Sequence, residues 1–140
     1  MRVSVRGVII EDGKVLAMFR RKVSPEKTKE YYVVPGGGQE GNETLLETLK
    51  RELMEEMSIE VEVIGYLGKD VYGESTSHFF HCKKVGGEIK LSGPELETIS
   101  EENYYEPRFV EIDELNNIDF ICKEFVFKAL NEEYENLDNN

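Results

Sequence analysis

Three glutamates stand close together in one short stretch of the sequence, at positions Glu52, Glu55 and Glu56. Residues three and four positions apart share one face of an α-helix, so a helix here would bring the three carboxylates together. Like charges at this spacing repel, and a hard cation with oxygen ligands relieves the repulsion. Magnesium accepts carboxylates, keeps several waters and binds phosphates at its open positions. The spacing therefore indicates a metal site for phosphate chemistry, with a solvated Glu-rich helix face as the alternative.

Hydrophobic residues predict the helix that would carry these glutamates. Between Glu43 and Met57 they recur at three- and four-residue steps, which is typical of an amphipathic helix. The expected buried stripe consists of Leu46, Leu49, Leu53 and Met57. We expect Asn42 to cap the helix and Glu43 to favour the positive end of its dipole.

One arginine lies within the acidic stretch. Arg51 is four residues from both Glu47 and Glu55, so its guanidinium is expected to offset part of the repulsion. Ahead of the helix, the run from Pro35 to Gly38 cannot continue the short strand predicted for Tyr31 to Val34, and we expect a turn there. A glycine turn beside clustered carboxylates can hold metal ions, metal-bound water and a phosphate chain together.

The spacing from Val33 to Ile59 resembles the signature of the Nudix hydrolase superfamily. That signature reads Gly, five residues, Glu, seven residues, Arg-Glu-aliphatic, one residue, Glu-Glu, one residue, Gly, aliphatic. The residues that match it in register are Gly37, Glu43, Arg51, Glu52, Leu53, Glu55, Glu56 and Ile59. Ser58 replaces the Gly that ends the helix, so the helix either bears a cost of about 1 kcal/mol for a left-handed serine or ends in a different way. Because Ser58 carries no ligand, we expect lower local stability with the chemistry retained.

The resemblance implies an α+β fold of the α/β/α sandwich type, built on a mixed β-sheet. It also implies an enzyme in which water attacks a phosphorus of a nucleoside diphosphate linked to another group, with a divalent cofactor, Mg²⁺ or alternatively Mn²⁺. The implied metal ligands are the side chains of Glu52, Glu55 and Glu56 and the carbonyl of Gly36. Arg51 and Glu43 would orient the helix and its carboxylates rather than contact phosphorus.

Other residues are candidates to act on or contact the substrate. Glu52 and the loop residue Glu97 rank together as the group that completes removal of the water's proton. The family often supplies a cation to the phosphates after the second strand, and the glycine run is expected against the same phosphates. The residues concerned are Arg20, Arg21, Lys22, Gly37 and Gly38. Tyr31, Tyr72, Phe79 and Phe80 could stack on a base, although aromatic residues in strands more often belong to the core.

The sequence does not name the leaving group. Damaged nucleoside triphosphates, ADP-ribose and other sugar nucleotides all fit, and the compact length favours a MutT-like role on triphosphates. Two other function classes stay open. A binding module would hold a nucleotide without cleaving it, although such modules usually lose one of the metal carboxylates. A plain interaction domain would use the acidic helix only as surface.

Bulk properties bound the remaining choices. The 140 residues fit a single domain spanning residues 1–140. A net charge of −12 repels nucleic-acid polymers and anionic membranes, and it also repels a small phosphorylated substrate unless bound cations neutralise the site. The resemblance implies a small-molecule nucleotide as the partner, and a homodimer stays open. Without a visible signal peptide or membrane span, we expect a cytoplasmic protein. Cys82 and Cys122 lie far apart, and no zinc site is expected.

The rest of the chain reads as strands separated by turns. The predicted strands are Val3–Ile10, Val15–Phe19, Glu60–Leu67, Ser75–Val85 and Tyr104–Ile112, with a hairpin turn at Asp12-Gly13. Loops are expected over residues 21–30 and 93–103, and a terminal helix over Phe120–Glu133. This order lacks the regular alternation of a parallel doubly wound fold, so it favours a mixed sheet with helices packed on it.

Overall fold

Seven β-strands of the described residues form one mixed sheet. The computed structural model describes residues 2–90, 100 and 102–137. The strands are β1 (Arg2–Glu11), β2 (Lys14–Val23), β3 (Thr28–Val33), β4 (Gly36–Gly38), β5 (Ile59–Tyr72), β6 (Ser75–Gly87) and β7 (Asn103–Glu111). Their order is β3-β2-β1-β6-β5, with β4 beside β1 and β7 beside β2. β1 and β6 run parallel and the other pairs antiparallel, which confirms the predicted mixed sheet.

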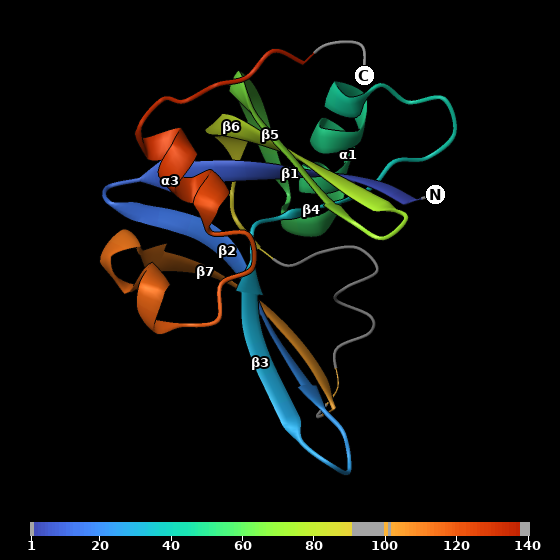
Figure 1. The fold of residues 1–140 in the computed structure, drawn as a ribbon, viewed down its shortest axis with the longest axis vertical. Helices are drawn as coiled ribbons and strands as arrows, with labels where there is room; N and C mark the ends of the chain where they lie inside the picture. The colour runs from blue at the N-terminus through green and yellow to red at the C-terminus, as the bar shows by residue number, and fades with distance from the viewer. Residues whose placement is uncertain (1, 91–99, 101, 138–140) are drawn as a thin grey trace.

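The sheet divides into two parts, which are joined by the tight hairpin between β1 and β2. β1 and β2 pair at Ile10 with Val15 and at Glu11 with Lys14, beside the predicted turn. The turn residues Asp12 and Gly13 have φ values of 50° and 76°, as a type I′ turn requires. Beyond the turn β1 stays with β4, β5 and β6, whereas β2 joins β3 and β7 in a part that extends away from the rest (Figure 1).

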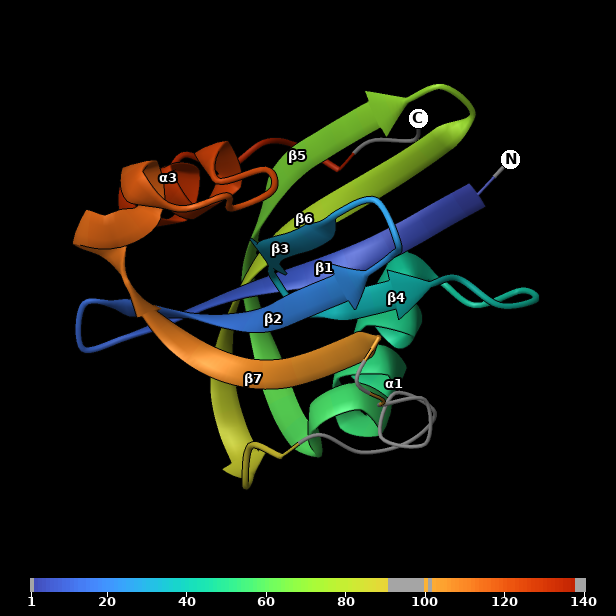
Figure 2. The same ribbon diagram turned by 90° about the horizontal axis from the view of Figure 1, so that it is seen from below.

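Helices cover both faces of the sheet, as Figure 2 shows. α1 (Leu45–Met57) packs on one face, and α3 (Glu124–Leu130) with the short 3-10 helix η1 (Ile112–Asn117) covers the other. Because strand side chains alternate, Val5 and Ile9 of β1 join the core under α1, whereas Val8 joins the core under α3. This arrangement confirms the predicted α/β/α sandwich. Within the described ranges, no helix has the length and apolar character needed to cross a bilayer.

Helix α1 begins later than the sequence predicted. Its N-cap is Thr44, whose hydroxyl accepts from the Glu47 N–H at 3.1 Å while the Glu47 carboxylate accepts from the Thr44 N–H at 2.8 Å. The predicted cap at Asn42 is therefore wrong, and Glu47 is engaged at the cap. Ser58 ends the helix at φ 60° and ψ 36°, the left-handed conformation that a glycine would adopt at less cost.

The buried stripe of α1 differs from the prediction at one position. Leu49, Leu53 and Met57 are fully buried, whereas Leu46 in the first turn is 42% exposed. Leu45 packs against the core instead. Helical periodicity gives the direction in which a side chain points, but it does not tell how much of the helix the sheet covers.

Two further predictions differ from the structure. The loop predicted over residues 21–30 is wrong at both ends, because β2 continues to Val23 and β3 starts at Thr28. The side chains there are largely exposed, so no hydrophobic alternation marks these strand ends. The terminal helix is shorter than predicted, since a turn with Cys122 at φ 57° precedes α3. Most of the loop predicted over residues 93–103 lies outside the described residues.

The two leucines of α1 provide a matched test of this packing. We expect Leu53→Ala to lower the free energy of unfolding by about 2–5 kcal/mol, because it leaves a cavity in the core. Leu46→Ala should change it by less than about 0.5 kcal/mol. Urea denaturation of both variants measures the difference, and equal losses would show that the helix packs in another orientation.

Candidate active site

A cavity of about 280 Å³ opens where α1 lies beside β4 and β1. Its lining combines glycine backbone, two carboxylates and three guanidinium groups. The structure brings together these sequence-predicted residues in the lining: Arg20, Gly36, Gly37, Gly38, Glu52 and Glu56. Glu97 lies outside the described residues.

The three glutamates of α1 reach the cavity to different extents. Glu56 is 8% exposed, and its Oε1 accepts a hydrogen bond from the Gly36 N–H at 3.3 Å. The Glu52 side chain is 14% exposed and also lines the cavity. The Glu55 side chain is 47% exposed and lies outside the lining. Two of the carboxylates therefore form part of the cavity wall, and the third stands at its more solvated side.

Arg51 joins the helix to the segment that precedes it. Its guanidinium bonds Glu43 through Nε and through Nη2 at 2.9 Å, and Nη2 also donates to the Gly38 carbonyl at 2.9 Å. Nη1 donates to Glu52, the next residue, at 3.0 Å and to Glu55, one turn further along the helix, at 2.8 Å. With Glu40 at 3.6 Å, one cation thus lies among four carboxylates and a carbonyl, and its hydrogen bonds hold β4 and the helix in a fixed relation.

Glu43 lies before the first turn of α1 rather than inside it. Hydrogen bonds from Arg51 and from the Glu40 N–H lower the pKa of Glu43 to about 2. The Thr48 hydroxyl also donates to it, at 3.0 Å. Glu43 is therefore ionised throughout the physiological range, and its charge is committed to the Arg51 contact.

The glycines of β4 form a short strand where the sequence predicted a turn. Gly36 pairs with Arg6 and Gly37 with Val5. A Cβ at Gly37 would lie 2.2 Å from Glu52 Oε1, and a Cβ at Gly36 would lie 2.1 Å from the Val5 carbonyl oxygen. Glycine is required because the carboxylate and a neighbouring strand occupy the space of a side chain. The Glu52 carboxylate consequently lies directly against bare backbone.

The sequence analysis missed three polar residues of the cavity. Arg2 and Arg6 come from β1, and Tyr105 comes from β7. Arg6 carries a usable signal, since it places a charge in the middle of a strand whose neighbours are mostly buried and apolar. The Arg2 and Tyr105 positions follow from the way the two parts of the sheet meet, which no local pattern reveals.

Several predicted substrate contacts lie elsewhere. Phe79 and Phe80 are 1% and 2% exposed and belong to the two cores, so the suggestion that they stack on a base is wrong. Tyr72 is 84% exposed at the end of β5. Arg21 faces Glu30 at 3.7 Å and is not part of the cavity lining.

The donor set of the cavity fits a hard divalent cation. Glu52 and Glu56 offer carboxylate oxygens beside the Gly36 backbone, with Glu55 one turn away on the same helix. Oxygen ligands of this kind suit Mg²⁺ and Mn²⁺. The close approach of Glu52 to Gly37 also leaves no room for a side chain that would screen the carboxylate.

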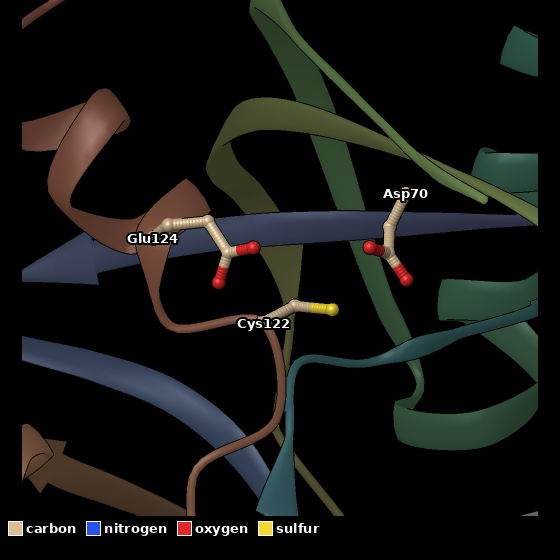
Figure 3. Close-up of side chains that lie close together, drawn as sticks. All are labelled: Asp70, Cys122 and Glu124. Carbon is tan, nitrogen blue, oxygen red and sulfur yellow. The ribbon is translucent and has the colours of Figure 1, made fainter. Parts of the chain in front are cut away.

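A second group of acidic and thiol side chains lies near the start of α3. The ligand atoms of Asp70, Cys122 and Glu124 all lie within 4.8 Å of one another (Figure 3). Burial, followed by the charges of the two carboxylates, raises the pKa of Cys122 to about 11. The thiol is therefore protonated near neutral pH, which makes it a weak nucleophile and a weak metal ligand.

The glycines of β4 give a matched test of the metal site. We expect Gly37→Ala to displace the Glu52 carboxylate and weaken Mn²⁺ binding about tenfold, with little change in thermal stability. Gly38→Ala is the control, since its Cβ would have no atom nearer than 3.8 Å. Electron paramagnetic resonance titration with Mn²⁺ measures both, and equal affinities would remove Glu52 from the metal site.

The pKa of Glu43 can be checked directly. Because its folded pKa is depressed, the stability it contributes is fully present above its ordinary value of 4.5 and is lost as the pH falls towards 2. We expect its carboxyl carbon resonance to titrate near pH 2, and Glu43→Gln to flatten the pH dependence of stability between these values. A midpoint near 4.5 would mean that the Arg51 contact is absent in solution.

Known proteins resemble this chain in both sequence and fold. A family model described as the NUDIX domain matches residues 1–126. An ADP-ribose pyrophosphatase from Methanocaldococcus jannaschii is 35% identical over 94 residues, covering 63% of this chain and 54% of that protein. The chain thus matches about half the length of this curated relative.

Solved structures share the fold at lower sequence identity. A MutT NUDIX hydrolase from Burkholderia pseudomallei has a TM-score of 0.68 at 19% identity, covering 92% of this chain and 97% of that one. An ADP-ribose pyrophosphatase from Streptococcus suis has a TM-score of 0.65 at 17% identity, covering 98% and 96%. At these identities the solved structures show a shared fold only, and the family of the chain follows from the family model. With its match over residues 1–126, the chain belongs to the NUDIX domain family.

Proposed function

We propose that this chain is a Mg²⁺-dependent hydrolase that cleaves the diphosphate linkage of a nucleotide. The observation that carries the proposal is the placement of Glu52 and Glu56 against the bare backbone of β4 within one cavity. Guanidinium groups line the same cavity, so it offers both metal ligands and partners for phosphate oxygens. Membership of the NUDIX family supports this chemistry.

Glu52, Glu55, Glu56 and the Gly36 carbonyl are the proposed ligands. A bound Mg²⁺ supplies Lewis acidity, which lowers the pKa of a coordinated water and offsets charge on the phosphates. The chain's own residues must orient the carboxylates and accept a proton. Arg51 orients Glu52 and Glu55 by donating a hydrogen bond to each. Glu56 is held separately, by the hydrogen bond that it accepts from the Gly36 N–H.

Glu52 is the proposed proton acceptor within the described residues. It lines the cavity, and the hydrogen bond from Arg51 Nη1 at 3.0 Å orients its carboxylate. Glu97 stays a second candidate from the sequence. Replacing each in turn by Gln and comparing the pH dependence of kcat separates them, because loss of the base removes the acidic limb of the profile.

Two substrate classes deserve a direct comparison. Nucleoside triphosphates are the leading proposal, since the cavity presents several cations to the substrate. ADP-ribose is the second, because the Methanocaldococcus jannaschii relative is named an ADP-ribose pyrophosphatase. The two classes can be ranked by the rate of hydrolysis with Mg²⁺ over a panel of triphosphates, dinucleoside polyphosphates and nucleotide sugars. Phosphate release is measured with and without added pyrophosphatase.

The buried carboxylate gives the sharpest test of the proposed function. We expect Glu56→Gln to lower kcat on the best substrate about 100-fold or more, because it removes a metal ligand that also bonds the Gly36 N–H. Glu62→Gln, at an exposed position of β5, is the matched control and should retain activity. Ligand-dependent thermal stabilisation of the wild type without any turnover would instead favour a binding module.

A further inference from the structure

Thr48 is a polar residue on the apolar side of α1. Its side chain is fully buried, in a stretch of helix where Leu45 packs against the core and Leu49 is also fully buried. A hydroxyl in such a position costs free energy unless it is hydrogen-bonded, whereas a valine of the same shape would carry no such cost. Packing alone therefore does not account for a threonine here, and the hydrogen bonds of its hydroxyl must do so.

The Thr48 hydroxyl has two acceptors within reach. Its Oγ1 lies 3.0 Å from Glu43 Oε1 and 3.0 Å from the Thr44 carbonyl oxygen. The single hydroxyl proton forms its stronger hydrogen bond with the charged carboxylate. The Thr44 carbonyl already accepts from the Thr48 N–H at 3.0 Å, within the regular helical pattern. The bond to Glu43 is therefore the one that this side chain adds to the structure.

The bond joins a carboxylate outside the helix to a stiff side chain within it. Glu43 Oε1 also accepts from the Glu40 N–H at 2.9 Å and from Arg51 Nη2 at 2.9 Å. The first of these donors belongs to the segment that precedes α1, and the second ends a long side chain with several rotatable bonds. Thr48 is short and β-branched, so few side-chain rotamers are open to it. It therefore restricts the position of the Glu43 carboxylate more closely than Arg51 can.

A line of contacts leads from Thr48 to the metal-binding carboxylates. Thr48, Arg51 and Glu52 lie on one edge of α1, because three and four residues separate them. Glu43 accepts from both Thr48 and Arg51, so its place determines where the Arg51 guanidinium lies. The same guanidinium donates to Glu52 at 3.0 Å and to Glu55 at 2.8 Å. A shift of Glu43 is thus passed on to both carboxylates.

We propose that Thr48 is a positioning residue of the site, which fixes Glu43 and through it the Arg51 guanidinium and the carboxylates of Glu52 and Glu55. Its effect on turnover rests on the proposed function, whereas its effect on Arg51 concerns groups of the protein alone. Without the hydroxyl, Glu43 keeps its bonds from Glu40 and Arg51. The pair therefore persists, but it samples a wider range of orientations.

The test compares two substitutions that differ in the hydroxyl. Thr48→Val removes it and keeps the shape, and Thr48→Ser keeps it. Thr76→Val, at a partly buried threonine of β6, is the matched control. Thr48→Val is also made in the Glu43→Ala background, which completes a double-mutant cycle. Thermal unfolding checks that each variant folds, and the comparison of valine with serine stands by itself if the double variant does not.

Three measurements follow the proposed line of contacts. The first is the exchange rate of the Arg51 Nε–H with water, measured by NMR, and the second is Mn²⁺ affinity, measured by electron paramagnetic resonance. The third is KM and kcat for the best nucleotide substrate at saturating Mg²⁺. Because the exchange rate requires neither metal nor turnover, it tests the positioning role even in a protein that shows neither.

The expected changes are moderate and selective. Thr48→Val should speed the exchange, weaken Mn²⁺ binding and lower kcat, each about threefold or more, with KM changed by less than about twofold. A direct partner of a metal ligand typically contributes about tenfold or more, and Thr48 acts one contact further away. Thr48→Ser should restore all values to within about twofold of the wild type, and Thr76→Val should leave them unchanged. In the Glu43→Ala background, Thr48→Val should have no further effect.

A purely structural role of the hydroxyl would lower the unfolding temperature of Thr48→Val and leave the three measurements at their wild-type values, which would overturn the proposal. Failure of Thr48→Ser to restore them, or an undiminished effect in Glu43→Ala, would overturn it as well. In each of these cases a wild type that hydrolyses nucleotides keeps the proposed function. Thr48-dependent exchange and Mn²⁺ binding in a wild type that hydrolyses no nucleotide would support the positioning role and remove the proposed function.

Discussion

The contact between Arg51 and Glu43 determines where the rest of the site stands. The guanidinium reaches back to Glu43 and the Gly38 carbonyl, and forward to Glu52 and Glu55. It therefore ties the glycine strand to the helix in a single bonded unit. Without that tie, neighbouring carboxylates on one helix face would repel and spread towards water. The arginine keeps Glu52 and Glu55 together, while Glu56 accepts a hydrogen bond from the Gly36 N–H of β4.

Glycine backbone supplies the second constraint on the site. Because Gly37 has no side chain, the Glu52 carboxylate approaches the strand more closely than any Cβ would permit. The Gly36 N–H bonds Glu56, so the same strand holds both carboxylates of the cavity from one side. The helix and the strand are thus mutually adapted, and neither alone would form the site.

The sequence predicts the parts of this structure that depend on local periodicity or fixed spacing. The mixed sheet and the hairpin at Asp12 follow from such patterns, and the motif spacing implies the sandwich. At Ser58 the sequence leaves two helix ends open, and the structure has the left-handed one. The start of α1 does not, because Asn42 and Thr44 are both good caps and the reciprocal bond with Glu47 decides between them. Leu46 likewise lies on the same side of the helix as the buried leucines, but its exposure depends on how far the sheet extends beneath the first turn of α1.

The arginines of β1 show why part of the site was not predicted. Arg20 of β2 was expected from the family resemblance, whereas Arg2 and Arg6 line the same cavity because of the way the sheet is arranged around the β1–β2 hairpin. Their chemical type is still informative. A buried lysine readily loses its proton, whereas a guanidinium retains its charge even when burial lowers its pKa, as it does for Arg6. In a chain with a net charge of −12, arginine is therefore the residue that can keep a small cavity attractive to an anion.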